Sequence, residues 1–75
     1  IKEVMRSYIK LTGKDLSEES YRSLELSILR IAYALAKLSK SNVTPIHVVK
    51  AIQLKDNTLT TEQIKYLTAI AKGLI

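Results

Sequence analysis

Hydrophobic residues recur every three or four positions along most of the chain, which is the spacing of an amphipathic α-helix. The first such segment covers residues 1–12 and is followed by Gly13, which suits the left-handed conformation just past a helix end. Another covers residues 45–54, and a last one follows Thr60. No segment alternates with the period of a β-strand, so the pattern predicts an all-α fold.

The segment formed by residues 17–40 is the longest, and nothing in it interrupts the helical spacing. A helix that is apolar on two sides packs against neighbours on both sides. At about 1.5 Å per residue this one would span roughly 34 Å. We therefore expect a small four-helix bundle with one long central helix whose two flanks are covered. One apolar stripe holds Tyr21, Leu24, Ile28, Ile31, Leu35 and Leu38, and the other holds Leu26, Leu29, Tyr33 and Ala36.

Three of the predicted helices begin with the same capping pattern. Ser17, Thr44 and Thr60 are placed as N-caps, whose side-chain oxygen accepts a hydrogen bond from the first helical turn. A hydrophobic residue precedes each cap and faces another at the fourth position of the helix. Pro45 occupies a first helical position, where its missing N–H is harmless, and Gln63 completes a capping box with Thr60. These starts support the expected helix boundaries.

The composition is that of one small globular domain. The chain has 75 residues, 47% hydrophobic and 25% charged, and no cysteine, so neither a disulfide framework nor a thiolate metal site is available. No apolar run approaches the roughly 20 residues of a membrane span, and no signal-peptide pattern opens the chain. We expect one helical domain over residues 1–75, cytoplasmic and with no membrane contact. Because the chain starts at Ile1 rather than Met, we expect a piece of a longer protein.

Residue types that carry catalysis are present but are not arranged for it. His47 is the only histidine and has no cysteine beside it, so we expect no metal site and interpret it as a surface or capping residue. Glu18 and Glu19 are adjacent and point in different directions, which suits a helix N-terminus rather than an acid–base pair. No serine has a histidine at helical spacing, and no glycine-rich phosphate loop occurs. We expect no catalytic residue and no catalysis by this chain alone.

Basic residues outnumber acidic ones by 12 to 7, which gives a net charge of +5. They form one row on the first predicted helix and another on the polar face of the long helix. Such rows either contact nucleic-acid phosphates, with little sequence reading, or form a solvated surface. No aromatic residue is expected within the rows, so only Tyr8 and Tyr66 are candidates for stacking on bases. The candidate nucleic-acid contacts are Lys2, Arg6 and Lys10 on the first helix and Arg30 and Lys37 on the second, with Arg22 in the same second row.

Residues 28–52 resemble part of the α-helical lid of AAA+ ATPases. In such lids a long helix carrying an (I/L)-R-(I/L/V)-A element is followed by V-T-x-x-(H/D)-(V/A)-x-x-A-(I/L). The lids of minichromosome maintenance helicases, Orc-type initiators and the magnesium chelatase group look most similar, and the resemblance covers about a third of the chain. The elements here are Leu29-Arg30-Ile31-Ala32 and Val43-Thr44-Pro45-Ile46-His47-Val48-Val49-Lys50-Ala51-Ile52.

The resemblance implies a role in the DNA replication machinery. In those lids an arginine early in the long helix reaches the γ-phosphate of ATP held by a neighbouring core domain. Arg22, in Arg22-Ser23-Leu24-Glu25, is similar to the arginine in the R-x-L-E of helicase lids and would sense nucleotide. The resemblance also implies that the parent protein is an ATPase or helicase whose core domain, with ATP and Mg²⁺, is the partner. This chain alone would bind no cofactor.

Two other functions stay open. The first is a small helical bundle that binds nucleic acid, as a template-binding accessory domain of a primase or replication protein does. Binding that weakens steeply with salt would favour it. The second is a protein-interaction or oligomerisation domain, in which the long helix presents one apolar strip to a partner.

Overall fold

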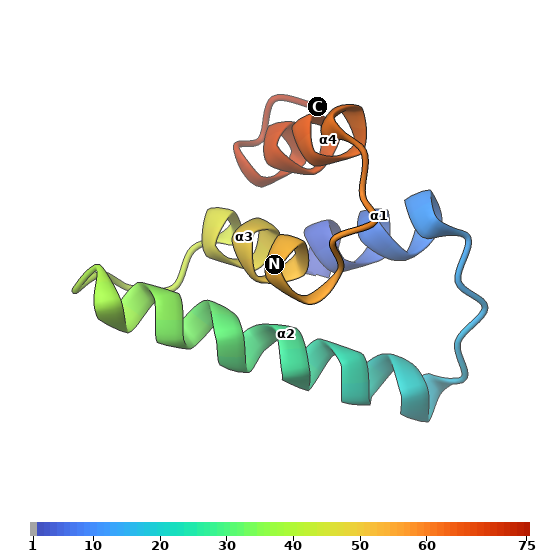
Figure 1. The fold of residues 1–75 in the computed structure, drawn as a ribbon, viewed down its shortest axis with the longest axis horizontal. Coiled ribbons are helices and arrows are strands. Elements are labelled where there is room, and N and C mark those ends of the chain that lie inside the picture. Colours follow the sequence, from blue (N-terminus) through green and yellow to red (C-terminus); the bar gives the residue numbers. More distant parts are fainter. Residues whose placement is uncertain (1) are drawn as a thin grey trace.

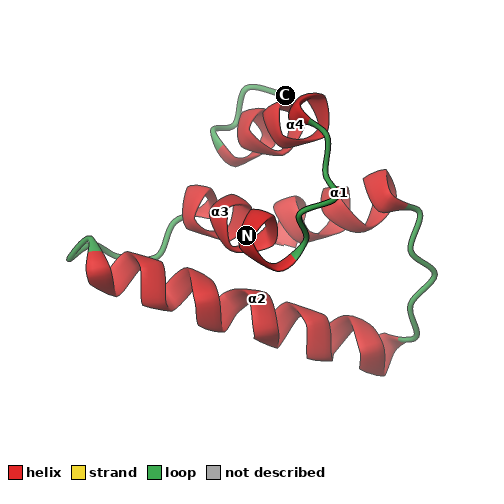
Figure 2. Cartoon of the chain, in the orientation of Figure 1, coloured by secondary structure: helices red, strands yellow, loops and turns green. Residues whose placement is uncertain are grey.

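Residues 2–75 form four α-helices joined by short connections. The structure, a computed structural model, describes residues 2–75, so the predicted helical position of Ile1 lies outside the described residues. The helices are α1 (Lys2–Thr12), α2 (Glu18–Leu38), α3 (Pro45–Lys55) and α4 (Thr61–Ala71), and no strand occurs in this range (Figure 2). The predicted fold class is confirmed: it is an all-α, small four-helix bundle with one long central helix, α2, of 21 residues.

α3 contacts all three of the other helices. α2 packs along one side of α3, whereas α1 and α4 pack against α3 elsewhere and against each other (Figure 1). α2 runs along the longest dimension of the molecule, which measures 35 Å. The three short helices have 11 residues each, so each is about half as long as α2.

The core is one aliphatic cluster that draws on all four helices. Its largest fully buried side chains include Met5, Ile28, Ile52 and Leu67, one from each helix. α3 contributes four buried residues out of 11, the highest share of any helix. The hydrophobic face of every other helix therefore meets α3, and this short helix organises the bundle.

The predicted caps of α2 and α4 are confirmed. Ser17 Oγ accepts the Ser20 backbone N–H at 3.2 Å, and Thr60 Oγ1 accepts the Gln63 backbone N–H at 3.1 Å. A second hydrogen bond runs in the opposite direction, because Gln63 Oε1 accepts the Thr60 backbone N–H at 2.9 Å. This reciprocal pair is the predicted capping box, and it satisfies two backbone donors that a helix start would otherwise leave without partners.

His47 completes the start of α3. The helix begins at Pro45, directly after the N-cap Thr44, as predicted. Nδ1 of His47 accepts the backbone N–H of Thr44 at 2.9 Å, and the Thr44 hydroxyl lies 2.9 Å from the same nitrogen. This bond requires an unprotonated Nδ1, so the imidazole does what Glu or Gln usually does at this position. The interpretation of His47 as a capping residue is confirmed.

The expectation that both flanks of α2 are covered is wrong. Leu26 and Tyr33, from the second predicted stripe, each leave 59% of their surface exposed, and Leu38 leaves 82% exposed. The buried residues of α2 are instead Ile28 from the first predicted stripe, Ala32 from neither stripe and Ala36 from the second. α3 packs on α2 here, and within residues 2–75 no other helix covers the opposite face, which carries the exposed Leu26 and Tyr33. One face of α2 is therefore packed, and the other is open to solvent.

One long-range side-chain hydrogen bond joins α1 to the α3–α4 connection. The Tyr8 hydroxyl donates to Asp56 Oδ2 at 2.7 Å, across 48 positions of sequence. Tyr8 is only 2% exposed, so its predicted availability for base stacking is wrong. Burial and the Asp56 carboxylate raise the pKa of Tyr8 above its usual value. Hydrogen bonds from Thr58 and Tyr8 lower the pKa of Asp56 to about 2.

We expect this bond to make stability depend on pH. The pKa of Asp56 is lower in the folded chain than its usual 3.8, so its contribution is complete above about pH 5 and is lost as the pH falls toward about 2. Asp56→Asn should remove this acid dependence, because the amide does not titrate. Tyr8→Phe should lower the free energy of unfolding near neutral pH by about 1 kcal/mol and weaken the acid dependence.

Chemical denaturation at several pH values measures both effects. Tyr66→Phe is the matched control, because Tyr66 lies on α4 with 42% of its surface exposed. It should change neither the stability nor its pH dependence. An acid dependence that persists unchanged in Asp56→Asn would contradict the role given to this carboxylate.

Candidate functional site

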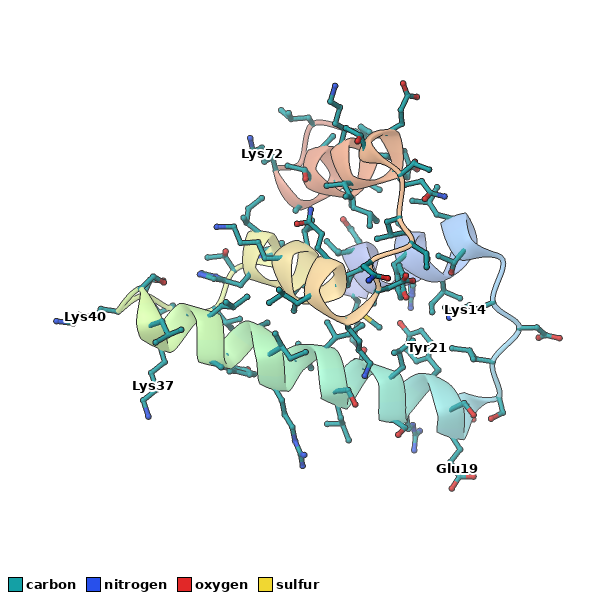
Figure 3. The ribbon with its side chains drawn as sticks, viewed as in Figure 1. Lys14, Glu19, Tyr21, Lys37, Lys40 and Lys72 are labelled. Atoms are coloured by element: carbon teal, nitrogen blue, oxygen red, sulfur yellow. The ribbon has the colours of Figure 1, made fainter. Side chains whose placement is uncertain are left out.

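A shallow cleft lies between the N-terminal halves of α1 and α2. Figure 3 shows Tyr21 pointing from α2 toward the body of the bundle, and its ring packs against the core. Three cations and two carboxylates line the cleft, so its net charge is +1. The cleft thus brings together three basic residues singled out from the sequence. It has a volume of about 340 Å³ and is lined by Lys2, Arg6, Glu18, Tyr21, Arg22 and Glu25.

Arg22 makes an exposed ion pair at this cleft. Its guanidinium nitrogen lies 2.9 Å from Glu18 Oε1, one helical turn earlier, and the two side chains are 73% and 81% exposed. An exposed pair of this kind contributes about 0.5 kcal/mol or less. Arg22 can therefore leave Glu18 for a more highly charged anion at little cost, which a nucleotide-sensing role requires.

The predicted contacts Arg30 and Lys37 lie on the open face of α2. At about 100° of rotation per residue, Leu26, Arg30, Tyr33 and Lys37 fall within an arc of about 60°, and all four are exposed. Tyr33 follows Arg30 by three positions and precedes Lys37 by four, so it neighbours both on the helix surface. The expectation that no aromatic residue lies within the basic rows is therefore wrong, because Tyr33 is on the surface rather than in the core.

A second hollow adjoins this face where α2 ends. One wall is α2 and the other is the α2–α3 connection. Ser41 and Asn42 supply groups that donate and accept hydrogen bonds, beside the aromatic ring of Tyr33. The hollow thus combines an aromatic ring, a cation and an amide. Its volume is about 460 Å³, and its lining residues are Tyr33, Ala36, Lys37, Ser41, Asn42 and Val43.

Lys40 follows α2 in a conformation that favours glycine. Its φ is +53°, and no other non-glycine residue between 2 and 75 has a positive φ. A side chain in this left-handed region costs about 1–2 kcal/mol. The Lys40 N–H donates to the Lys37 carbonyl at 3.1 Å and the Ser41 N–H to the Ala36 carbonyl at 3.0 Å, the two bonds of a Schellman motif. The two glycines of the chain have the same conformation after α1 and α4.

The residues that line this hollow belong to a long segment without acidic residues. Residues 26–55 contain no Asp or Glu, and all seven acidic residues of the chain lie outside this range. The absence of acidic residues marks the second half of α2 and all of α3 as a positively charged region. The spacing of the basic rows alone does not identify this region. This segment carries five basic residues: Arg30, Lys37, Lys40, Lys50 and Lys55.

The predicted nucleic-acid contacts are distributed over separate regions. Lys2 and Arg6 line the cleft beside the start of α2, whereas Lys37 lines the hollow at its end. Lys10 lines neither and lies in the last turn of α1, where a positive charge complements the helix dipole. The two basic rows therefore supply two distinct anion-accessible regions rather than one continuous surface.

Neither a metal site nor a relative adds to this picture. Within residues 2–75, no three His, Cys, Asp or Glu side chains are grouped so that they could hold a metal ion. In the same range, no helix combines the length and apolar character of a membrane span. Comparison with known protein families, curated proteins and solved structures finds no significant match.

We expect Lys40→Gly to stabilise the fold, because it removes the cost of a side chain in the left-handed region. The free energy of unfolding should rise by about 1 kcal/mol in chemical denaturation. Gly73→Ala is the reciprocal control: Gly73 ends α4 with a φ of +74°, and nothing lies within 4 Å of an added Cβ. It should lower stability by a similar amount. A neutral or destabilising Lys40→Gly would show that the lysine conformation carries no cost.

Proposed function

We propose that the chain is a helical lid or accessory module of a DNA-dependent ATPase of the replication machinery, and that it is not catalytic by itself. In this role it packs on the core domain of its parent protein, which binds ATP and Mg²⁺ in the cytoplasm. It moves with the nucleotide state of that domain and contributes Arg22 to the nucleotide site.

The packing of α2 along α3 is the observation that carries this proposal. Residues 28–52, which resemble the AAA+ lid, contain the second half of α2 and most of α3. These two helices share the most extensive interface in the bundle. A lid transmits motion only if its helices move as one body, and the burial of Ile28 and Ile52 in one core supports this.

Arg22 is the residue that we assign to the nucleotide. It lies early in the long helix, beside the cleft, and its ion pair with Glu18 is exposed. The planar guanidinium group can donate two parallel hydrogen bonds to phosphate oxygens. Lys2 and Arg6 line the same cleft and add positive charge that favours the approach of a polyphosphate.

The test is ATP hydrolysis by the full native protein that carries this chain, with and without DNA. Arg22→Ala should lower the turnover number by about tenfold to a thousandfold, because it removes a donor to the developing charge on the γ-phosphate. Arg22→Lys should restore little of the activity, because an ammonium group lacks the planar fork.

Lys65→Ala is the matched control, because Lys65 is an exposed cation on α4 and lines neither hollow. Its turnover number should equal that of the unmodified protein. Turnover that is unchanged in Arg22→Ala, or a full native protein that hydrolyses no ATP, would contradict the lid proposal.

A second candidate function is nucleic-acid binding by the bundle itself, which the exposed Arg30 and Lys37 on the open face of α2 favour. It is compatible with the first, since it uses a different part of α2. The third, a protein-interaction or oligomerisation domain, draws on the exposed Leu26 and Tyr33. Leu29 joins these two residues at helical spacing but is partly buried, and Arg30 adjoins both, so a positive charge borders the exposed apolar surface.

A further inference from the structure

We propose that the open face of the second half of α2 binds single-stranded nucleic acid, with a base stacked on Tyr33 and neighbouring phosphates held by Arg30, Lys37 and Lys40. These four residues form what we name the Tyr33 platform. This inference deepens the second candidate function. It does not rest on the lid proposal, because the Tyr33 platform does not include the cleft that contains Arg22.

Tyr33 has the exposure and the surroundings that base stacking requires. It leaves 59% of its surface exposed, so much of its ring contributes nothing to the burial that stabilises the bundle. The ring borders the hollow of about 460 Å³, which leaves room beside it for a planar group. A base stacked on Tyr33 would cover the ring and bring a base edge within reach of the Asn42 amide.

Cations lie on both sides of the ring. Arg30 and Lys37 are each about one helical turn from Tyr33, which places their Cβ atoms about 5–6 Å from its own. Figure 3 shows Lys37 and Lys40 projecting from the same end of α2 into solvent. A phosphate on either side of a stacked base therefore meets a positive charge.

The backbone of Lys40 is an independent observation that points to the same place. A side chain in the left-handed conformation is unfavourable, and such residues persist where the surrounding structure holds them and are common at functional sites. α4 ends in the same Schellman motif with Gly73 at the corresponding position. What lysine supplies at the end of α2, and glycine would not, is a positive charge next in sequence to Ser41, which lines the hollow.

The charges around the Tyr33 platform indicate which class of ligand it binds. With no acidic residue in residues 26–55, the platform favours a polyanion over a basic or mixed-charge protein surface. A duplex keeps its base faces stacked inside, so it would contact the cations alone. A single strand offers phosphates and open base faces together, which matches both parts of the platform.

The test is the fluorescence anisotropy of a labelled oligothymidylate of about 12 nucleotides, titrated with the chain at low salt. Tyr33→Ala should weaken binding by about tenfold or more, whereas Tyr33→Phe, which keeps the ring, should bind like the unmodified chain. Tyr66→Ala, which removes another exposed aromatic ring, is the matched control and should bind normally. A duplex of the same length should bind more weakly, and its affinity for Tyr33→Ala should equal its affinity for the unmodified chain.

Salt dependence separates the cations from the ring. Lys37→Ala should lower the slope of log affinity against log salt by about 0.7, whereas Tyr33→Ala should lower affinity without changing the slope. Lys40→Gly should weaken binding while stabilising the fold, so its effect cannot come from unfolding. Lys72→Ala, at the end of α4 in Figure 3, should change neither affinity nor slope.

Three binding results would each overturn the proposal. They are no binding at about 50 mM salt, binding that Tyr33→Ala leaves unchanged, and equal affinity for duplex and single strand. Self-association of the chain that Tyr33→Ala abolishes in sedimentation would also overturn it, because this face would then serve a second copy. None of these results bears on ATP hydrolysis, so the lid proposal and this one fail separately.

Discussion

The packing of α2 against α3 through one face only is the constraint on which the rest of the structure depends. Ile28 and Ala32 lie on the packed face, and α1 and α4 contact α3 rather than the far side of α2. All three short helices lie on one side of α2 (Figure 1), so no helix within residues 2–75 covers its other side. The outer face of the long helix is therefore free to serve binding rather than stability.

Local features of the fold could be predicted from the sequence, whereas burial could not. Helix starts depend on hydrogen bonds over three residues, so Ser17 and Thr60 identified them correctly. Burial depends on which neighbours reach a given face, and hydrophobic spacing does not contain that information. Tyr33 was therefore assigned to the core although it is exposed. The bond from Tyr8 to Asp56 spans 48 positions and has no local signal.

At the candidate site, too, local features could be predicted from the sequence, whereas features that depend on packing could not. The polar face that carries Arg22 could be predicted from helical spacing, but its place in one cleft with Lys2 and Arg6 depends on how α1 packs. For the end of α2 the sequence does hold a signal, because no glycine follows this helix and no acid occurs in residues 26–55. Both features become meaningful only once the structure shows Lys40 with a positive φ, directly before Ser41 and Asn42, which line a hollow.

The most direct test of one-sided packing compares two truncations on opposite faces of α2. Ile28→Val removes one methylene group from a side chain that is 0% exposed and should lower the free energy of unfolding by about 0.5–1.5 kcal/mol. Leu26→Ala removes more atoms from a side chain that is 59% exposed and should change it by less than about 0.5 kcal/mol. Chemical denaturation measures both. A larger loss for Leu26→Ala than for Ile28→Val would contradict the account, because the outer face of α2 would then be packed.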